Sequence, residues 1–137
     1  DFDTGITVSN GGLNAPFGDM VLYLSFLSGY GEGYEILKRS SLEEMWQAQV
    51  PISNANGLIT SMGLSFFILE REGLRVVGHT GTQMGFHSFI YLEPESRTAA
   101  IFVVNTYEIA EGGSPTRALS AEIRDSLFNI VFPLFMK

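Results

Sequence analysis

The stretch "GHTGTQMGFHSFIYLEP", residues 78–94, decides the fold and raises the question of function. A Gly-His-Thr-Gly run leads through a glycine turn into residues 86–92, which alternate like a β-strand. Glycine lets a neighbouring backbone or a ligand approach where a side chain would block it. His79 adds a titratable group and Thr80 adds a hydroxyl. The run therefore predicts a strand edge that binds a ligand or another segment of backbone.

Composition limits the classes of function. The chain has 137 residues, enough for one domain, and a net charge of −7. That balance excludes the basic footprint expected for nucleic acid or an anionic membrane surface. The absence of cysteine excludes a disulfide framework, a thiolate nucleophile and a zinc–thiolate site. The longest apolar runs, such as residues 64–69, are too short to span a bilayer.

Helices flanking a block of strands are the predicted organisation. We expect helices near residues 16–29, 41–49 and 115–136, and strands near residues 62–70, 74–81, 86–92 and 98–105. The connections between the strands are short and polar, which is typical of an antiparallel meander. The predicted fold class is α/β in the broad sense and α+β in the narrow one. It is an antiparallel sheet flanked by helices, in a single segment of residues 1–137.

Capping residues predict where the first two helices begin and end. Asn14 is the expected N-cap of the first helix, and Gly29 is its expected end. Ser40 and Glu43 have the spacing of a capping box for the second helix, and Pro51 is its expected stop. Residues 54–57 are expected to form a turn.

The last helix has a start signal and a disturbed end. Ser114 is its expected N-cap, with Pro115 in the first turn, and Pro133 should kink or fray the last turn. Helical spacing predicts one apolar face, made of Leu119, Ile123, Leu127, Ile130 and Leu134.

The predicted strands are apolar on both alternating sets of residues. In residues 98–105, Ala100, Phe102 and Val104 alternate with three other apolar side chains. A sheet that faces water on one side should instead alternate with polar residues. This sheet therefore needs cover on both faces. Eleven phenylalanines in so short a chain point to an oligomer or to a covering region elsewhere.

Several kinds of site are disfavoured. Gly78, Gly81 and Gly85 do not form the G-x-G-x-x-G pattern of dinucleotide binding, and no P-loop motif occurs. A metal site would need His79 and His87 to converge with a carboxylate such as that of Glu93 or Glu95. The two histidines lie on either side of a glycine turn and no other residue has ligand spacing, so no metal is expected. Neither histidine has a spacing that suggests a Ser-His-carboxylate triad.

The ordered set of motifs resembles a known family. His-Thr-Gly at residues 79–81 is followed by "GFHSFIYLEPE" and then by "AAIFVVN". This order resembles the C-terminal part of the serine beta-lactamase-like family, which includes class C beta-lactamases, D-alanyl-D-alanine carboxypeptidases and related esterases. The upstream "NGGLNAPFGDMVLYLSFLSG" resembles the family segment with a Gly-Gly-Leu, a turn and a helix ending in glycine. The likeness covers nearly the whole chain.

The resemblance implies the substrate side of an acyl-transfer site. His79 would stand where the family has a lysine or histidine that helps to poise the general base. Thr80 would offer its hydroxyl to a substrate carboxylate, and Gly81 would let the substrate lie along the strand. The backbone N–H of Thr82 would be one of two oxyanion donors. The implied substrate is a small acyl, peptide or ester compound, with no cofactor, and histidine in place of lysine favours peptidases and esterases over antibiotic hydrolysis.

The family's nucleophile has no counterpart in the sequence. No serine is followed three residues later by lysine, and no tyrosine precedes an asparagine by two. Both motifs lie upstream in the family, so we expect a C-terminal portion that is inactive alone; a start at Asp1 without methionine fits. The expected partner is the upstream region of the same enzyme, or a self-association partner, covering the apolar sheet. The alternative is a catalytically dead binding module, and the resemblance suggests an extracytoplasmic location for either.

Overall fold

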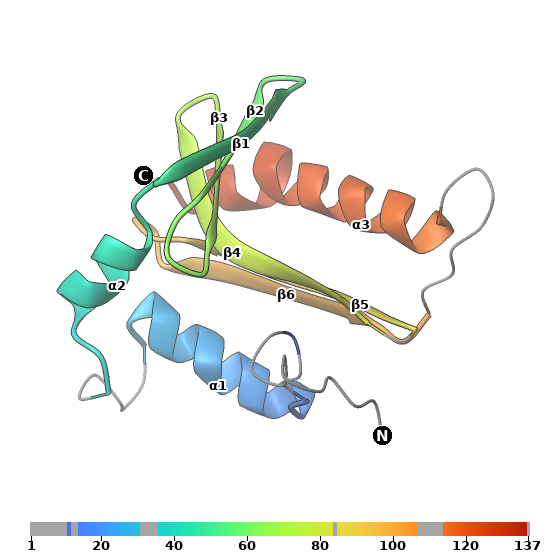
Figure 1. Cartoon of the computed structure of the whole chain (residues 1–137), viewed down its shortest axis with the longest axis horizontal. Coiled ribbons are helices and arrows are strands. Elements are labelled where there is room, and N and C mark those ends of the chain that lie inside the picture. Colours follow the sequence, from blue (N-terminus) through green and yellow to red (C-terminus); the bar gives the residue numbers. More distant parts are fainter. Residues whose placement is uncertain (1–10, 12–13, 31–35, 84, 107–113, 137) are drawn as a thin grey trace.

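The computed structural model describes residues 11, 14–30, 36–83, 85–106 and 114–136. Its centre is an antiparallel sheet whose strands follow one another in chain order. The strands are β1 (Val50–Ala55), β2 (Leu58–Met62), β3 (Phe67–Arg71), β4 (Leu74–Gln83), β5 (Phe86–Glu93) and β6 (Thr98–Val104). Helices α1 (Phe17–Ser28) and α2 (Arg39–Met45) lie on one side of the sheet, and α3 (Pro115–Ser126) lies on the other (Figure 1). The predicted α+β meander flanked by helices is confirmed.

Two hydrophobic cores form because both alternating sets of strand residues are apolar. Val76 and Val77 are adjacent in β4, yet they pack into different cores, since successive side chains point to opposite faces. The core under α1 and α2 contains Leu24, Leu27, Leu42, Trp46, Phe66, Ile68, Val77 and Leu92. The core under α3 contains Leu58, Leu69, Leu74, Val76, Phe89, Tyr91, Phe128 and Phe132. Each large apolar side chain that becomes fully buried contributes about 1.5–3 kcal/mol.

Helix α1 ends where the sequence predicts but begins differently. Gly29 ends it with a left-handed φ of 77°, and its N–H bonds to the carbonyl of Phe26. The residue at the N-cap is Pro16, whose φ of −57° suits a helix entry. Asn14 as the N-cap is therefore wrong, because the helix begins at Phe17 and leaves Asn14 outside the cap position.

Helix α2 is shorter than expected. It begins at Arg39 after Lys38, so Ser40 already lies in the first turn and the predicted capping box with Glu43 is wrong. Glu43 instead pairs with Arg39, with a carboxylate oxygen 3.2 Å from Nε. The helix ends at Met45, so the prediction that Pro51 stops it is wrong as well.

Arg39 holds α2 against α1. Its Nη1 donates to the carbonyl of Leu27 at 3.0 Å, in the last turn of α1. A cation near a helix C-terminus satisfies a carbonyl that has no partner within the helix. The guanidinium also lies 4.8 Å from the ring centroid of Trp46, which is buried.

The hairpin of β1 and β2 was not predicted, although its turn was. Asn56 and Gly57 form a two-residue loop with φ of 52° and 75°, as in a type I′ hairpin turn. The expected strand over residues 62–70 is split, because β2 ends at Met62 and β3 begins at Phe67.

Helix α3 begins as predicted and buries a different face. The Ser114 side chain accepts a hydrogen bond from the Arg117 N–H, which confirms the N-cap. The helix passes through a π-helical turn, Leu127–Val131, and a 3₁₀ turn, Phe132–Leu134, around the predicted disturbance at Pro133. The predicted apolar face is wrong in part, because Leu119, Ile130 and Leu134 are exposed. The buried face instead carries Thr116, Ser120, Phe128 and Phe132.

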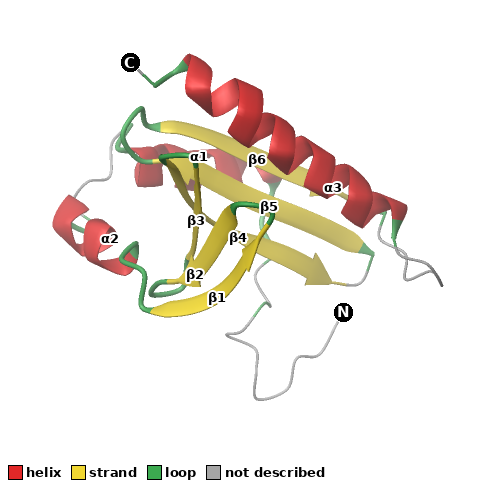
Figure 2. Ribbon diagram, turned by 90° about the horizontal axis from the view of Figure 1, so that it is seen from above, coloured by secondary structure: helices red, strands yellow, loops and turns green. Residues whose placement is uncertain are grey.

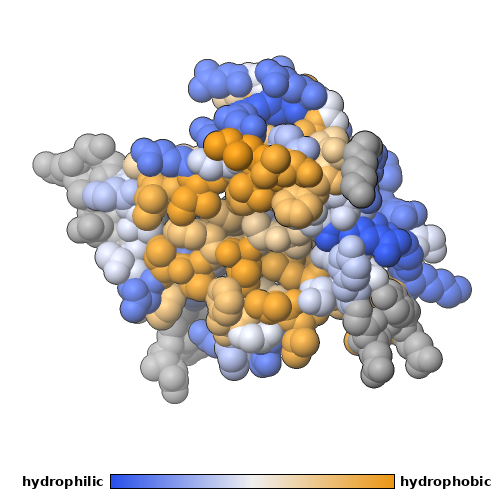
Figure 3. Space-filling view, turned by 180° about the vertical axis from the view of Figure 1, so that it is seen from behind, coloured by the Kyte–Doolittle hydropathy of each residue, from blue (hydrophilic) through white to orange (hydrophobic). Residues whose placement is uncertain are grey.

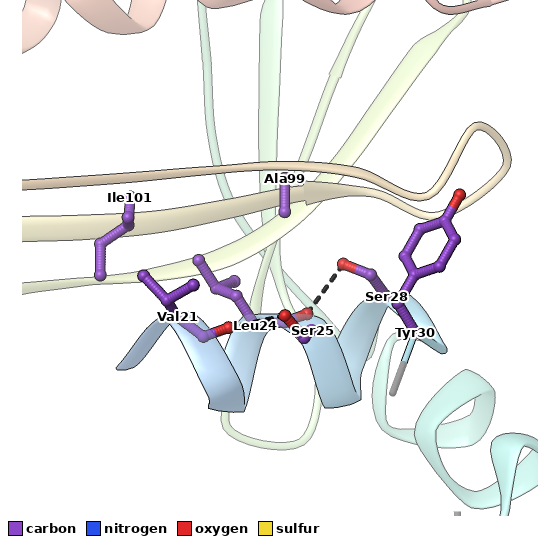
Figure 4. A pocket seen from close by; sticks show the side chains of 7 residues that line it. All are labelled: Val21, Leu24, Ser25, Ser28, Tyr30, Ala99 and Ile101. Carbon is purple, nitrogen blue, oxygen red and sulfur yellow. Dashed lines mark hydrogen bonds between the residues drawn. The ribbon is translucent and has the colours of Figure 1, made fainter. Parts of the chain in front are cut away.

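Both faces of the sheet carry helices, and an exposed apolar surface lies beside the β6 edge. Strand β6 pairs only with β5 among the described strands and forms one end of the sheet (Figure 2). From behind, apolar residues gather over the middle of the molecule (Figure 3). A hollow of about 190 Å³ lies between α1 and β6, where Val21 and Leu24 point toward Ala99 and Ile101 (Figure 4).

Candidate active site

The predicted site residues lie where β4 extends beyond β3. The last pair between these two strands is Phe67 with Gly78, whereas β4 continues to pair with β5 as far as Gln83. Residues 79–83 therefore have a strand on one side only, among the strands that the structure describes. The chain turns away before β3 through Gly63–Phe66, where Ser65 has a φ of 65°.

Exposure changes sharply at this point of β4. Val76, Val77 and Gly78 are buried, and His79, Thr80, Gly81 and Thr82 are exposed. The four predicted site residues thus share one open strand edge. Side chains alternate along a strand, so His79 points to the face opposite that of Thr80 and Thr82.

His79 lies against an aromatic ring. Its imidazole centroid is 5.2 Å from that of Phe67, with the planes inclined by 30°. Phe67 is the first residue of β3, so this contact forms where the shorter strand stops. The packing holds the ring at the open edge while leaving the side chain exposed.

The two glycines that flank His79 and Thr80 have different environments. A Cβ on Gly78 would overlap the carbonyl oxygen of Ile90 on β5, so this glycine is required by the close approach of two backbones. A Cβ on Gly81 would meet Ser88 Oγ at 3.0 Å. Gly78 therefore allows β4 and β5 to approach each other closely, and Gly81 leaves the exposed edge without a side chain.

Sequence reasoning missed a polar cluster on the α3 side of β4. Thr82 Oγ1 lies 2.8 Å from His87 Nδ1, and His87 Nε2 lies 2.8 Å from Ser120 Oγ. His87 is only 8 % exposed. Burial lowers the pKa of His87 below its ordinary value, and the positive charge of Arg117 lowers it further. The imidazole is therefore neutral at neutral pH.

One signal in the sequence could have revealed the Thr82–His87 half of this cluster, whereas the Ser120 half depends on which face of α3 is buried. A short loop around Gly85 places Thr82 directly opposite His87 in an antiparallel hairpin. Thr116 and Ser120 are four residues apart in α3, so they share a face, and that face is the buried one. The sequence spacing suggested no Ser-His-carboxylate triad, and the printed partners of His87 are the hydroxyls of Thr82 and Ser120, not a carboxylate.

The two histidines do not converge on a metal. His79 stacks on Phe67, whereas His87 bonds to Thr82 and Ser120. Within the described ranges, no group of three or more histidine or carboxylate side chains is placed to hold an ion. Glu93 caps its own turn by accepting hydrogen bonds from the N–H groups of Glu95 and Ser96.

Comparison with known proteins decides the family. A family model described as Beta-lactamase matches residues 2–124. The chain belongs to the Beta-lactamase family. Neither a comparison with curated proteins nor one with solved structures found a match.

Membership of the Beta-lactamase family agrees with the architecture. The family implies a serine hydrolase-like fold, and the helix-flanked antiparallel sheet is consistent with it. The stretch from His79 to Thr82 lies inside the matched range, as does Ser120. No helix in the described part of the chain is both long and apolar enough to cross a membrane.

Proposed function

We propose that this chain supplies the His-Thr-Gly edge strand of a serine hydrolase that transfers acyl groups from peptide, ester or β-lactam substrates. The observation that carries the proposal is the open end of β4. Four consecutive residues, 79–82, are exposed there, and β3 does not pair with them. A substrate can add to such an edge as an extra strand, held by backbone hydrogen bonds.

Each residue of the edge has a role in this proposal. His79 carries an imidazole, which helps to poise the general base and attracts a substrate carboxylate. The Thr80 hydroxyl donates to that carboxylate, and Gly81 leaves room for the substrate backbone. The Thr82 N–H stabilises the oxyanion, and loss of such a donor typically lowers the rate by about 10²–10³.

The nucleophile comes from outside these residues in our proposal. The sequence contains no Ser-x-x-Lys and no Tyr-x-Asn. We propose that the chain is the C-terminal portion of the domain and that an upstream region of the same enzyme carries the serine. The outer edge of β6, which pairs with no further strand among the described residues, and the apolar surface beside it support a partner at this place (Figure 3).

A second candidate function is a catalytically dead binding module of the same fold. The missing Ser-x-x-Lys motif favours it, because a groove without a nucleophile can still bind an acyl or peptide ligand. The two functions differ in one respect, which is whether a partner with a reactive serine restores acylation.

Reconstitution tests the proposal. The 137-residue chain and its separately expressed upstream region are mixed with a fluorescent penicillin and, in parallel, with a fluorophosphonate. The enzyme proposal predicts a covalent label on a serine of the upstream region, and only in the mixture. Thr80→Val should weaken labelling by the carboxylate-bearing penicillin more than by the fluorophosphonate, whereas Thr60→Val on β2 serves as the control. Tight complex formation without any label would favour the binding module.

A further inference from the structure

Three side chains form a line of hydrogen bonds that the roles proposed above do not use. The line runs from Ser120 on α3, through His87 on β5, to Thr82 at the open end of β4. Both oxygen–nitrogen distances are 2.8 Å. Ser120 and His87 are each 8 % exposed, and Thr82 is exposed. The line therefore connects a buried helix face to the candidate site.

The environment of Ser120 fixes the direction of the first bond. Ser25 and Ser28 of α1 each donate to the carbonyl four residues earlier, at 2.9 and 2.8 Å. Ser120 makes no such bond within the described part of the chain, and its hydrogen bond is to His87. A buried hydroxyl hydrogen needs an acceptor. The arrangement therefore favours Ser120 as the donor and His87 Nε2 as the acceptor.

The chemistry of imidazole fixes the direction of the second bond. A neutral imidazole has one nitrogen that accepts and one that carries hydrogen. Since Nε2 accepts from Ser120, Nδ1 carries the hydrogen and donates to Thr82 Oγ1. Because Thr82 Oγ1 accepts this bond, its own hydroxyl hydrogen is available to donate to another acceptor. Thr82 is exposed at the open strand edge, where a ligand could supply that acceptor.

Burial and nearby charge keep the imidazole neutral. Burial of His87 is the larger cause that lowers its pKa, and the positive charge of Arg117, one turn before Ser120 on α3, lowers the pKa further. Protonation would place a hydrogen on Nε2, so Ser120 would lose its acceptor. The neutral imidazole is therefore the form that satisfies all three side chains.

We propose that Ser120, His87 and Thr82 form a directional hydrogen-bond relay that turns the Thr82 hydroxyl hydrogen outward, toward an oxygen of a ligand bound along β4. His87 is thus a positioning residue, and it acts through Thr82. That the ligand is an acyl substrate rests on the proposed function; the direction of the relay does not. The relay assigns a donor side chain to the same residue whose N–H is the proposed oxyanion donor.

The tautomer of His87 tests the relay directly. Long-range ¹H–¹⁵N NMR of the 137-residue chain, recorded well above the ordinary histidine pKa, reports which ring nitrogen carries hydrogen. His79→Gln assigns the signals, because the chain has two histidines. The relay requires Nδ1–H for His87. A spectrum with hydrogen on Nε2 would overturn it.

Variants separate the relay from simple packing. Ser120→Ala removes the donor, so the His87 signals should shift toward the Nε2–H tautomer, whereas Ser126→Ala at an exposed position of α3 should leave them unchanged. Thr82→Val removes the acceptor but keeps Ser120, so Nδ1–H should persist while its proton exchanges faster with water. Two results would refute the relay: a folded Ser120→Ala variant in which His87 keeps the Nδ1–H tautomer, or a Thr82→Val variant in which His87 carries its hydrogen on Nε2. Failure of the reconstitution experiment alone would count against the proposed function and leave the relay standing.

Discussion

Thr82 and His87 face each other across the β4–β5 pair, with Thr82 Oγ1 2.8 Å from His87 Nδ1. The contact ties the open end of β4 to the strand beside it, and Ser120 extends the tie to α3. An exposed strand end would ordinarily fray, because it has few buried contacts. Here the end of β4 is held by β5 and by the bond from Thr82 to His87, whereas the edge of β4 that β3 leaves uncovered stays open to a ligand.

Stability should fall as pH decreases through the titration of His87. Burial lowers its pKa in the folded state below the ordinary 6.5, so in that window the unfolded chain binds more protons than the folded one. The free energy of unfolding should therefore be largest above pH 6.5 and decline until the pH passes the lowered pKa. Chemical denaturation at a series of pH values measures the decline.

A matched pair of variants isolates this effect. His87→Gln keeps a polar side chain that does not titrate, so the decline between the lowered pKa and 6.5 should become shallower. His79→Gln should retain it. Equal slopes in His87→Gln and the unaltered chain would contradict a buried neutral His87.

Gly78→Ala should destabilise the fold. A Cβ there would overlap the Ile90 carbonyl, a backbone atom that moves only if β5 shifts. Overpacking of this kind typically costs about 1–3 kcal/mol. Gly18 in α1 is the control, since its Cβ would meet nothing within 4 Å and alanine in a helix gains about 0.5–1 kcal/mol over glycine. Thermal unfolding of both variants decides the point, and a neutral Gly78→Ala would mean that β4 and β5 are not this close.

The sheet was largely predictable from the sequence, and its first hairpin was not. Strands β4, β5 and β6 carry long apolar or alternating runs, so their pattern is visible without a structure. Strand β1 is exposed at every residue and contains a proline and a bulge. Because it has no buried face, its sequence shows no alternation of apolar and polar residues. Asn56 and Gly57 were the available signal, because such a pair favours a two-residue hairpin loop.

The candidate site was predictable only where its motif is continuous. Residues 79–82 form one continuous run in the sequence. They are exposed because β4 extends beyond β3, and no local sequence pattern predicts that difference in length. The partnership of His87 with Ser120 joins residues 33 apart, and it depends on which face of α3 is buried. Helical spacing favoured the face of Leu119, but that residue is 47 % exposed, because packing on the sheet selects the face with Phe128 and Phe132.

Thr80→Val should change substrate preference in the reconstituted protein. The proposed hydrogen bond joins the Thr80 hydroxyl to a substrate carboxylate, and bonds to charged groups contribute about 1.5–3 kcal/mol. Activity on carboxylate-bearing substrates should fall roughly tenfold to a hundredfold. Activity on neutral esters should hardly change. Comparing kcat/KM for the two kinds of substrate measures the difference, and equal losses would remove Thr80 from carboxylate recognition.

The isolated chain should self-associate or bind a hydrophobic dye. Among the strands that the structure describes, β6 is an edge strand whose seven residues include no lysine, proline or charge, and such edges favour pairing with another chain. Val103 is 44 % exposed on it, so Val103→Lys should reduce both association and dye binding. Ile59→Lys on β2 is the control at a comparable exposure of 43 %. A compact monomer in sedimentation, without dye binding, would argue against an uncovered apolar surface.

The chain alone should not be acylated. A serine nucleophile needs a base about 2.6–3.2 Å from its oxygen, and among the described serines Ser120 meets that distance, with His87 Nε2 at 2.8 Å. Ser120 is nevertheless only 8 % exposed, and its hydroxyl points into the contact between α3 and the sheet. A substrate carbonyl cannot reach it without displacing that contact.

We therefore expect no labelling of the chain by a fluorescent penicillin or a fluorophosphonate, and no hydrolysis of nitrocefin or a nitrophenyl ester above background. Ser120→Ala should match the unaltered chain in all four assays. Mass spectrometry of any labelled peptide separates the alternatives. A label on Ser120 that disappears in Ser120→Ala would make the buried pair a nucleophile, and the need for an upstream serine would be lost. A label on Ser88, which lies across from Gly81 at the open edge, would place the nucleophile within the strand pair itself.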